Sequence, residues 1–335
     1  MYAISNRRYT GSKLKLAGWI IDKIKANCTG SSFFEIFAGT SVISSNIAPY
    51  MKRIILNDTL ESNNIIYRAF YAHGNFSWDT LLKYKQKFLT LNNAKLTTGY
   101  FTKNYGGKYF GNIDCKNIEA IRNTIKKNRN RLTEKEYSIL FASLIYSMDK
   151  CANTVGHFDA YFRKNVTDGR FVFDIIEPMN FPDTYIDIYC EDANTLAPKI
   201  DADIVYIDPP YNSRQYCQFY HIYETLVRWD EPELFGVALK PAGKHLSDYC
   251  RNKAPEVFSD LLSKLNSRYI VVSYNNTYNS KSSSSRNKIT LHQLKQMLSQ
   301  YGNVKTFSKK HRFFNAGKTD FRNHKEYLFV TEVRK

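Results

Sequence analysis

The sequence predicts an α/β protein with a doubly wound, mostly parallel β-sheet that is interrupted by a largely helical insertion. Short apolar runs with β-branched members, such as the one at 204–207, are typical of strands covered on both faces. Helical patterns alternate with these runs, which indicates parallel strands joined by crossovers. The 335 residues suffice for one large domain with an insertion or for two domains.

The elements follow in a clear order before the insertion. The spacing of apolar residues predicts a helix over 16–24, after the segment RRYTGSK. Strands are expected over 33–37 and 53–58, and the first of them ends in a turn of small residues. Both strands would bring their carboxyl ends to one edge of the sheet, where ligands bind in open α/β folds.

Between 61 and 184 the pattern becomes mainly helical. Ile118, Ile121 and Ile125 mark one amphipathic helix, and the basic stretch KKNRNR follows it. A capping box from Thr133 to Glu136 opens a longer helix. We expect this insertion to be the part of the chain that is free to recognise a target.

Strand patterns return after the insertion. Parallel strands are expected over 185–190, 203–208 and 269–274, and a hairpin over 303–313 and 325–333 closes the sheet. The Ser- and Lys-rich segment 279–288 is expected to form a mobile loop.

The charge of the chain points to a polyanionic partner. Lys and Arg number 48 against 31 Asp and Glu, which gives a net charge of +17. Nucleic acid and an anionic membrane both fit such an excess, and basic charge can also serve solubility alone. No apolar run approaches the length of a transmembrane helix, and the N-terminal segment lacks a signal-peptide core. The composition therefore favours nucleic acid, and no membrane association is expected.

The six cysteines form no C-x-x-C pair, and the chain contains no H-E-x-x-H motif. Such a distribution is typical of reduced thiols in a cytoplasmic protein. We therefore expect a cytoplasmic protein without a metal site.

The end of the first strand has features of a nucleoside site. Ala38 and Gly39 lack bulk and allow close backbone approach by a ligand. Asp58 follows Gly39 by 19 positions and ends the second strand, the position from which an acidic residue binds ribose hydroxyls. A turn that only connects two elements is the alternative.

The N-terminal segment RYTGSKLKL places Gly11 and Ser12 just before a helix, where carboxylates and phosphates bind. Lys13 is a candidate partner for a ligand carboxylate. The alternative is an ordinary solvated basic N-terminus.

The segment DIVYIDPPY raises the sharpest question, because a buried strand ends on a carboxylate and two prolines. Asp208 and the carbonyl of Pro209 form two acceptors at fixed geometry, since Pro209 and Pro210 restrict the backbone. Tyr211 offers a ring face for stacking. Together these groups suit an aminated base flipped out of a duplex. A rigid exit from the strand with Asp208 as a cap is the alternative.

These motifs resemble one family. The segments RRYTGSKLKL and FFEIFAGTS, the strand-end Asp58 and the segment DIVYIDPPY occur in the order of class-alpha, Dam-like N6-adenine DNA methyltransferases. The longer segment DPPYNSRQYCQFYHIYETLVRWD is most similar to methylases of type II restriction-modification systems, the FokI and NlaIII kinds. The matches lie at both ends and in the middle of the chain and leave mainly 61–184 uncovered.

The resemblance implies a Rossmann-like sheet that binds S-adenosylmethionine as methyl donor, without a metal. It assigns the methionyl end to Tyr9 and Lys13. The remaining cofactor contacts fall on Phe37, Ala38, Gly39, Asp58, Asp192 and Asp208. The family motif usually reads F-A-G-T-G, but this chain has Ser41 in the last glycine position. A serine fits there if its φ is negative.

The resemblance also implies catalysis by Asp208, Pro209, Pro210 and Tyr211 on the N6 amine of a flipped adenine in double-stranded DNA. A separate cognate restriction endonuclease would be a further partner. The expected division is a catalytic domain of 1–60 and 185–335 and a target-recognition insertion of 61–184. Within the insertion, Asn153, His157 and Arg163 are candidates for contacts near the base, and the basic stretch for contacts to phosphates.

Two other hypotheses remain open from the sequence. Related pockets act on cytosine N4, on RNA or on glutamine amides. A non-catalytic DNA-binding regulator on the same fold is the third hypothesis. Asp rather than Asn or Ser before the two prolines, together with the motif order, favours adenine in DNA.

Overall fold

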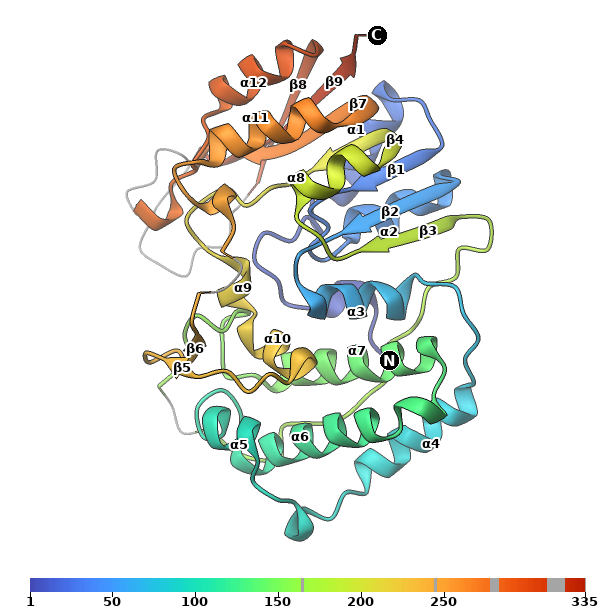
Figure 1. Cartoon of the computed structure of the whole chain (residues 1–335), viewed down its shortest axis with the longest axis vertical. Coiled ribbons are helices and arrows are strands. Elements are labelled where there is room, and N and C mark those ends of the chain that lie inside the picture. Colours follow the sequence, from blue (N-terminus) through green and yellow to red (C-terminus); the bar gives the residue numbers. More distant parts are fainter. Residues whose placement is uncertain (164–165, 244–245, 278–282, 312–322, 335) are drawn as a thin grey trace. The chain divides into compact units, whose positions relative to one another are not determined.

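The computed structural model describes residues 1–163, 166–243, 246–277, 283–311 and 323–334. The chain forms two compact units (Figure 1). The sheet unit comprises Ser12–Thr59, Phe181–Tyr216 and His245–Lys335. The helical unit comprises Met1–Gly11, Leu60–Asn180 and Cys217–Lys244.

A seven-stranded sheet in the order β3-β2-β1-β4-β7-β9-β8 forms the sheet unit. The strands are β1 (Ser32–Glu35), β2 (Arg53–Asn57), β3 (Tyr185–Tyr189), β4 (Asp201–Ile207), β7 (Asn266–Asn275), β8 (Gly302–Lys310) and β9 (Lys325–Val333). The first five strands in the order are parallel, and β9 is antiparallel to both of its neighbours. Because the order reverses beside β1, this is the doubly wound arrangement that the sequence predicts, with its ligand edge at the ends of β1 and β4.

Helices cover both faces of this sheet (Figure 1). One face carries α8 (Ala193–Leu196), α11 (Ala254–Lys264) and α12 (Leu291–Ser299), and the other carries α1 (Ala17–Asn27) and α2 (Val42–Ile47). Alternate strand residues such as Phe34 and Val205 join the buried cluster under α11 and α12. The central strands are apolar on both faces, because both faces are covered.

Helices make up most of the other unit. They are α3 (Glu61–Phe70), α4 (Trp78–Leu89), α5 (Tyr100–Tyr105), α6 (Asn112–Lys127), α7 (Glu134–Cys151), α9 (Tyr216–Phe219) and α10 (His221–Arg228). The first residue of α9 is assigned to the sheet unit and the rest of α9 to the helical unit. The helical unit also contains a short hairpin of β5 (Leu234–Phe235) and β6 (Lys240–Pro241). The helix α7 is buried along almost its whole length and packs on α3. The predicted capping box is confirmed, since Thr133 and Glu136 hydrogen-bond each other's backbone.

Single 3-10 turns connect several of these elements. In the sheet unit they are η2 (Ala48–Tyr50), η5 (Ala197–Lys199), η6 (Asp248–Cys250) and η8 (Ser283–Ser285). In the helical unit they are η1 (Ile4–Asn6), η3 (Asn93–Lys95) and η4 (Arg129–Arg131).

The boundaries of the units differ from the expected division of the chain. Residues 1–11 and 217–244 cluster with the insertion rather than with the sheet. Asp149 of α7 explains part of this difference, because it accepts hydrogen bonds from the Arg8 backbone at 2.9 Å and from the Tyr223 hydroxyl at 2.9 Å. These partners are far apart in sequence, so no local pattern indicates the contact.

Two of the predicted features lie partly outside the described residues. They are 279–282 of the Ser- and Lys-rich segment and 312–313 at the end of the first hairpin strand. Pairing of β8 with β9 confirms the hairpin itself. No helix in the described ranges is long and apolar enough to cross a membrane.

Candidate active site

The turn after β1 and the end of β2 form the first part of the site. Gly39 has a φ of 51°, and its N–H donates to Asp58 Oδ2 at 3.0 Å. The Ala38 N–H donates to the carbonyl of Asn57 at 2.9 Å. The structure therefore brings Ala38, Gly39 and Asp58 together, and Asp58 fixes the turn with one carboxylate oxygen.

Ser41 does not have the negative φ that was expected for a serine at this position. Its φ is 53°, in the left-handed region, rather than negative. A turn hydrogen bond from its N–H to the Ala38 carbonyl holds this conformation at 2.6 Å, and its Oγ donates to the Thr40 carbonyl at 2.7 Å. The side chain is buried. The chain thus keeps the backbone that a glycine favours, although a serine occupies it.

Phe37 and Asp192 lie at the neighbouring strand ends. The Phe37 ring meets Tyr249 edge-on, with centroids 5.0 Å apart, and the Tyr249 hydroxyl donates to Asn194 at 2.6 Å. Asp192 caps α8, where its Oδ1 accepts from the backbone N–H groups of Asn194 and Thr195. The structure therefore gives Asp192 a capping role, and Tyr249 is a residue that the sequence did not indicate.

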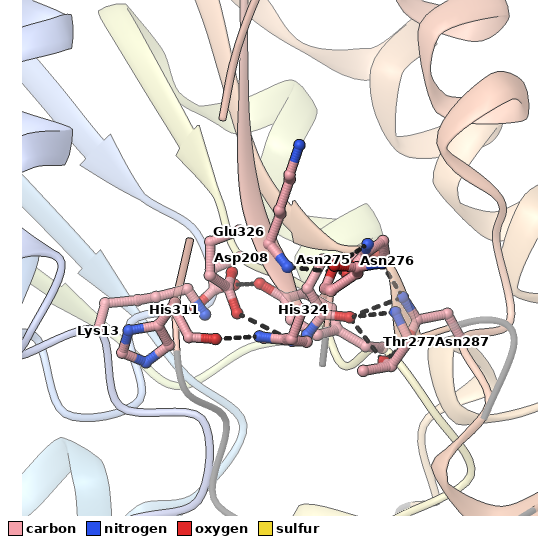
Figure 2. Close-up of polar contacts among 12 residues, drawn as sticks. Lys13, Asp208, Asn275, Asn276, Thr277, Asn287, His311, His324 and Glu326 are labelled. Carbon is pink, nitrogen blue, oxygen red and sulfur yellow. Dashed lines mark hydrogen bonds and ion pairs between the residues drawn. The ribbon is translucent and has the colours of Figure 1, made fainter. Parts of the chain in front are cut away.

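Asp208 follows the last residue of β4 and is held from two sides (Figure 2). Lys13 Nζ lies 2.9 Å from Asp208 Oδ2, and the Tyr211 hydroxyl donates to Oδ1. The Lys13 side chain is only 6% exposed. Burial by itself lowers the pKa of Lys13, but the charges of Asp208 and Glu326 outweigh burial, so the pKa is raised. Lys13 is therefore a charged partner of Asp208.

The loop Pro209-Pro210-Tyr211 is fixed by contacts within the sheet unit. Pro209 is buried and Pro210 half-buried. The Tyr211 ring lies 4.4 Å from that of Tyr274, and its carbonyl accepts the Lys288 N–H at 2.7 Å. Burial and the neighbouring Asp208 raise the pKa of the Tyr211 phenol well above its usual range, so it remains a donor. Its hydrogen bond to Asp208 adds a second role to the expected stacking.

Asn57 is a further residue that the sequence analysis missed. Its Nδ2 donates to the carbonyls of Ile36 and Glu191, both at 3.1 Å, and its Oδ1 accepts the Glu191 N–H at 3.0 Å. The side chain thereby joins the carboxyl ends of β1, β2 and β3. A hydrophobic-run pattern ending in Asn gives no signal for this role, because the three partners are distant in sequence.

Tyr9 belongs to the helical unit. Its ring stacks on that of Tyr220, with centroids 4.4 Å apart and planes 6° from parallel. Asn63 donates to its hydroxyl at 3.4 Å, and the Arg7 guanidinium lies 5.0 Å from its ring.

The candidate recognition residues also lie in the helical unit. Asn153 donates to the carbonyls of Lys108 and Phe162, which fixes the local backbone. His157 stacks on Phe219 with centroids 4.5 Å apart, whereas Arg163 is exposed. Asn153 therefore has a structural role, and Arg163 is the member of the three that is accessible to a partner.

The described ranges contain no group of three or more His, Cys, Asp or Glu side chains arranged to hold a metal ion. The sheet edge instead offers carboxylates, a buried ammonium and aromatic rings. Such groups bind hydroxyls, amines and flat rings, and they match a nucleoside cofactor and a base.

The strand order, the small-residue turn and the acidic strand ends define a Rossmann-like fold, the class in which ligands bind at the carboxyl edge of the sheet. The family model described as "D12 class N6 adenine-specific DNA methyltransferase" matches residues 9–276. The chain belongs to this family and is a DNA methyltransferase specific for adenine N6.

Curated relatives agree with this membership. The type II methyltransferase M.NlaIII of Neisseria lactamica is 30% identical over 352 residues, which cover 97% of this chain and 98% of that protein. The modification methylase StsI of Streptococcus sanguinis is 34% identical over 297 residues, and the type II methyltransferase M.FokI of Planomicrobium okeanokoites 31% over 288. The match covers 80% of this chain but only 44% of each of these two proteins.

Proposed function

We propose that this chain transfers a methyl group from S-adenosylmethionine to N6 of an adenine flipped out of double-stranded DNA. The observation that carries the proposal is the Asp208 carboxylate, held at the end of β4 by Lys13 and Tyr211. The names of the relatives support a role as the modification enzyme of a restriction-modification system. A separate restriction endonuclease would be its partner in such a system. Host DNA would be the protected substrate, and the cytoplasm its compartment.

The strand-end residues fit S-adenosylmethionine, which supplies an electrophilic methyl group when bound. The turn at Gly39 allows close approach, and Asp58 would accept the ribose hydroxyls. Phe37, with Tyr249, would form an apolar wall. The capping bonds of Asp192 use Oδ1, so Oδ2 is the atom that we propose for the adenine amine of the cofactor. Tyr9 and Lys13 remain the proposed contacts of the methionyl end.

The catalytic segment would act by alignment. The exocyclic amine of adenine is a poor nucleophile, because its lone pair is delocalised into the ring. Acceptance of both N–H bonds, by the Asp208 carboxylate and the Pro209 carbonyl, favours a pyramidal nitrogen whose lone pair points at the methyl group. No strong base is needed before attack, since a proton leaves the nitrogen afterwards. Positioning and electrostatics therefore supply most of the rate.

Tyr211 would hold the flipped base against its ring, a contact worth about 1–3 kcal/mol. Its hydroxyl donates to one oxygen of Asp208, the group that the substrate amine must reach. Binding of the base would thus exchange one donor to Asp208 for another. Pro210 fixes the backbone between Pro209 and Tyr211.

An end-product assay tests the proposal. The enzyme is incubated with labelled S-adenosylmethionine and either unmethylated DNA or RNA, and the products are digested to nucleosides. Label in N6-methyl-2′-deoxyadenosine from DNA is expected. Label in N4-methyl-2′-deoxycytidine, or label only in nucleosides from RNA, would replace the proposed substrate.

The variant Asp208→Ala should abolish this label, because it removes one of the two acceptors. We expect its DNA affinity to stay within about threefold of wild type, since phosphate contacts dominate affinity. Asp201→Ala is a matched control, because Asp201 is an exposed residue at the opposite end of the same strand. Near-normal turnover by Asp208→Ala would exclude the assigned role.

A further inference from the structure

A second carboxylate, Glu326, lies at the same sheet edge as Asp208. Because β9 runs antiparallel to β7, its first residues lie beside the carboxyl ends of the parallel strands, and Glu326 pairs in register with Asn275. Figure 2 draws Glu326 in one group with Lys13 and Asp208. The charges of Lys13 and Asp208 both act on Glu326, which makes the three residues one electrostatic cluster.

Glu326 is only 5% exposed. Its Oε2 has no hydrogen-bond partner in the described part of the chain, and its Oε1 lies 3.9 Å from His324 Nε2. A buried carboxylate with so few partners is costly unless a cation balances it. Lys13 is the cation of this cluster, and a single ammonium cannot neutralise both Asp208 and Glu326.

The amide of Asn275 is oriented toward Glu326 by its other partners. Its Oδ1 accepts from the Thr277 hydroxyl at 2.6 Å and from Asn287 Nδ2 at 2.9 Å (Figure 2). With the oxygen engaged there, Nδ2 is the donor group of this amide, and the influence of Asn275 lowers the pKa of Glu326. The position of Glu326 is therefore fixed by the pairing of β9 with β7.

We propose that Glu326 is a positioning residue for methyl transfer, which shares the Lys13 ammonium with Asp208 and so sets how strongly Asp208 accepts a hydrogen bond from the substrate amine. The proposal rests on the function proposed above for Asp208. An ionised Glu326 draws part of the Lys13 charge away and leaves Asp208 the stronger acceptor. An uncharged Glu326 leaves Lys13 wholly to Asp208, whose acceptor strength is then reduced.

Burial and the neighbouring charges set the pH at which Glu326 ionises and begins to share the Lys13 ammonium with Asp208. Burial raises the pKa of Glu326 to about 7, against the opposing effect of Lys13. The other titratable neighbours differ from it: the pKa of His324 and of His311 is lowered, and those of Tyr206 and Tyr211 are raised well above their usual range. Glu35, whose pKa burial raises to about 8, bonds to Ser44. Glu326 is thus the carboxylate of this cluster whose pKa lies near 7, about one unit below that of Glu35.

The test compares kcat of wild type and Glu326→Gln from about pH 6 to about pH 8.5, at saturating DNA and S-adenosylmethionine. Wild-type kcat should rise as pH passes about 7, because Glu326 ionises there. The Gln variant keeps the shape but not the charge, so its kcat should be flat and about tenfold lower at the alkaline end. Both KM values should stay within about twofold, since ground-state binding is unchanged.

Glu332→Gln is the matched control, because Glu332 lies on the same strand but is exposed and bonds to Arg268 and Tyr269. Its pH profile should follow wild type. A purely structural role of Glu326 would lower the melting temperature or raise KM without removing the pH dependence. If Gln lowers the melting temperature, Glu326→Asp replaces it in the comparison and should retain the rise of kcat with pH.

The results separate the two proposals. A wild-type profile in Glu326→Gln, or a flat profile in Glu326→Asp, would overturn the role of Glu326 and leave the methyltransferase assignment intact. A wild-type enzyme that places no label in N6-methyl-2′-deoxyadenosine would overturn the proposed function itself.

Discussion

At the scale of single residues, Ser41 shows how a departure from a family motif is accommodated. Its left-handed backbone is a conformation that costs a residue with a Cβ about 1–2 kcal/mol. The hydrogen bonds of its N–H and Oγ to Ala38 and Thr40 offset part of this cost. The turn at Gly39 is therefore retained, and the residual strain is confined to one buried position.

We expect Ser41→Gly to be more stable than Ser41→Ala by about 1 kcal/mol in the free energy of unfolding. Both variants lack the hydroxyl, so their difference isolates the backbone strain. Urea denaturation of the two purified variants measures this difference. An alanine variant as stable as the glycine variant would mean that the left-handed conformation carries no cost here.

Some residues of the candidate site lie close together in sequence, whereas others are brought together only by the fold. Asp208, Pro209 and Tyr211 are close in sequence, and Gly39 and Asp58 follow two successive strands, so local pattern suffices to nominate them as candidates. Lys13 was predicted as a ligand partner, but its pairing with Asp208 joins positions far apart in sequence. Glu326 lies in the segment HKEYLFV, where one acidic residue carries no signal. Only the sheet register places it beside Asp208.

At the scale of elements, the carboxyl ends of three strands depend on one amide. Asn57 replaces backbone pairing that the ladder cannot supply where β1, β2 and β3 diverge into their loops. The turn at Ala38 and the start of α8 both follow these strand ends. The geometry of the cofactor side of the site therefore depends on a side chain that need not touch the cofactor.

Asn57→Ala should lower the free energy of unfolding by about 2 kcal/mol, because it leaves the buried carbonyl of Ile36 and the half-buried backbone of Glu191 without this partner. Affinity for S-adenosylmethionine should fall as the strand ends loosen. Urea denaturation and titration calorimetry measure the two effects. Asn46→Ala is the control, since Asn46 is exposed on α2 and its loss should change stability by less than about 0.5 kcal/mol.

Strands were easier to predict than the elements between them. The parallel strands were expected from apolar runs, and their observed bounds differ from the expected ones by one to three residues. The hairpin of β5 and β6 was missed, because two-residue strands have no periodicity. Helix α10 follows the catalytic segment in the chain but belongs to the helical unit. Its Tyr223 hydroxyl, for example, donates to Asp149 of α7.

At the scale of the whole molecule, the candidate catalytic residues and the candidate DNA contacts belong to different units. The sheet unit holds Lys13, Asp58, Asp192 and Asp208. The helical unit holds the basic stretch after α6 and the exposed Arg163. A net charge of +17 suits a DNA substrate, although charge alone does not say which bases are recognised.

The helical unit is held together by contacts between its separate segments. Besides the bonds of Asp149, the Phe158 N–H donates to the Phe219 carbonyl at 2.7 Å, and His157 stacks on the Phe219 ring. An exchange of 61–184 alone would cut these contacts. An exchange of 1–11, 60–180 and 217–244 together would keep them within one donor protein.

We therefore expect two different results from chimeras with M.NlaIII, which aligns with 97% of this chain. The chimera that receives all three segments should fold and methylate the target of the donor, because base contacts set specificity. The chimera that receives only 61–184 should melt at a lower temperature, because Arg8, Phe219 and Tyr223 would face foreign partners. Sequencing of methylated sites and thermal melts measure both results. A folded and active three-segment chimera that retains the original target would place recognition in the sheet unit, in the loops that follow Tyr211 or β7.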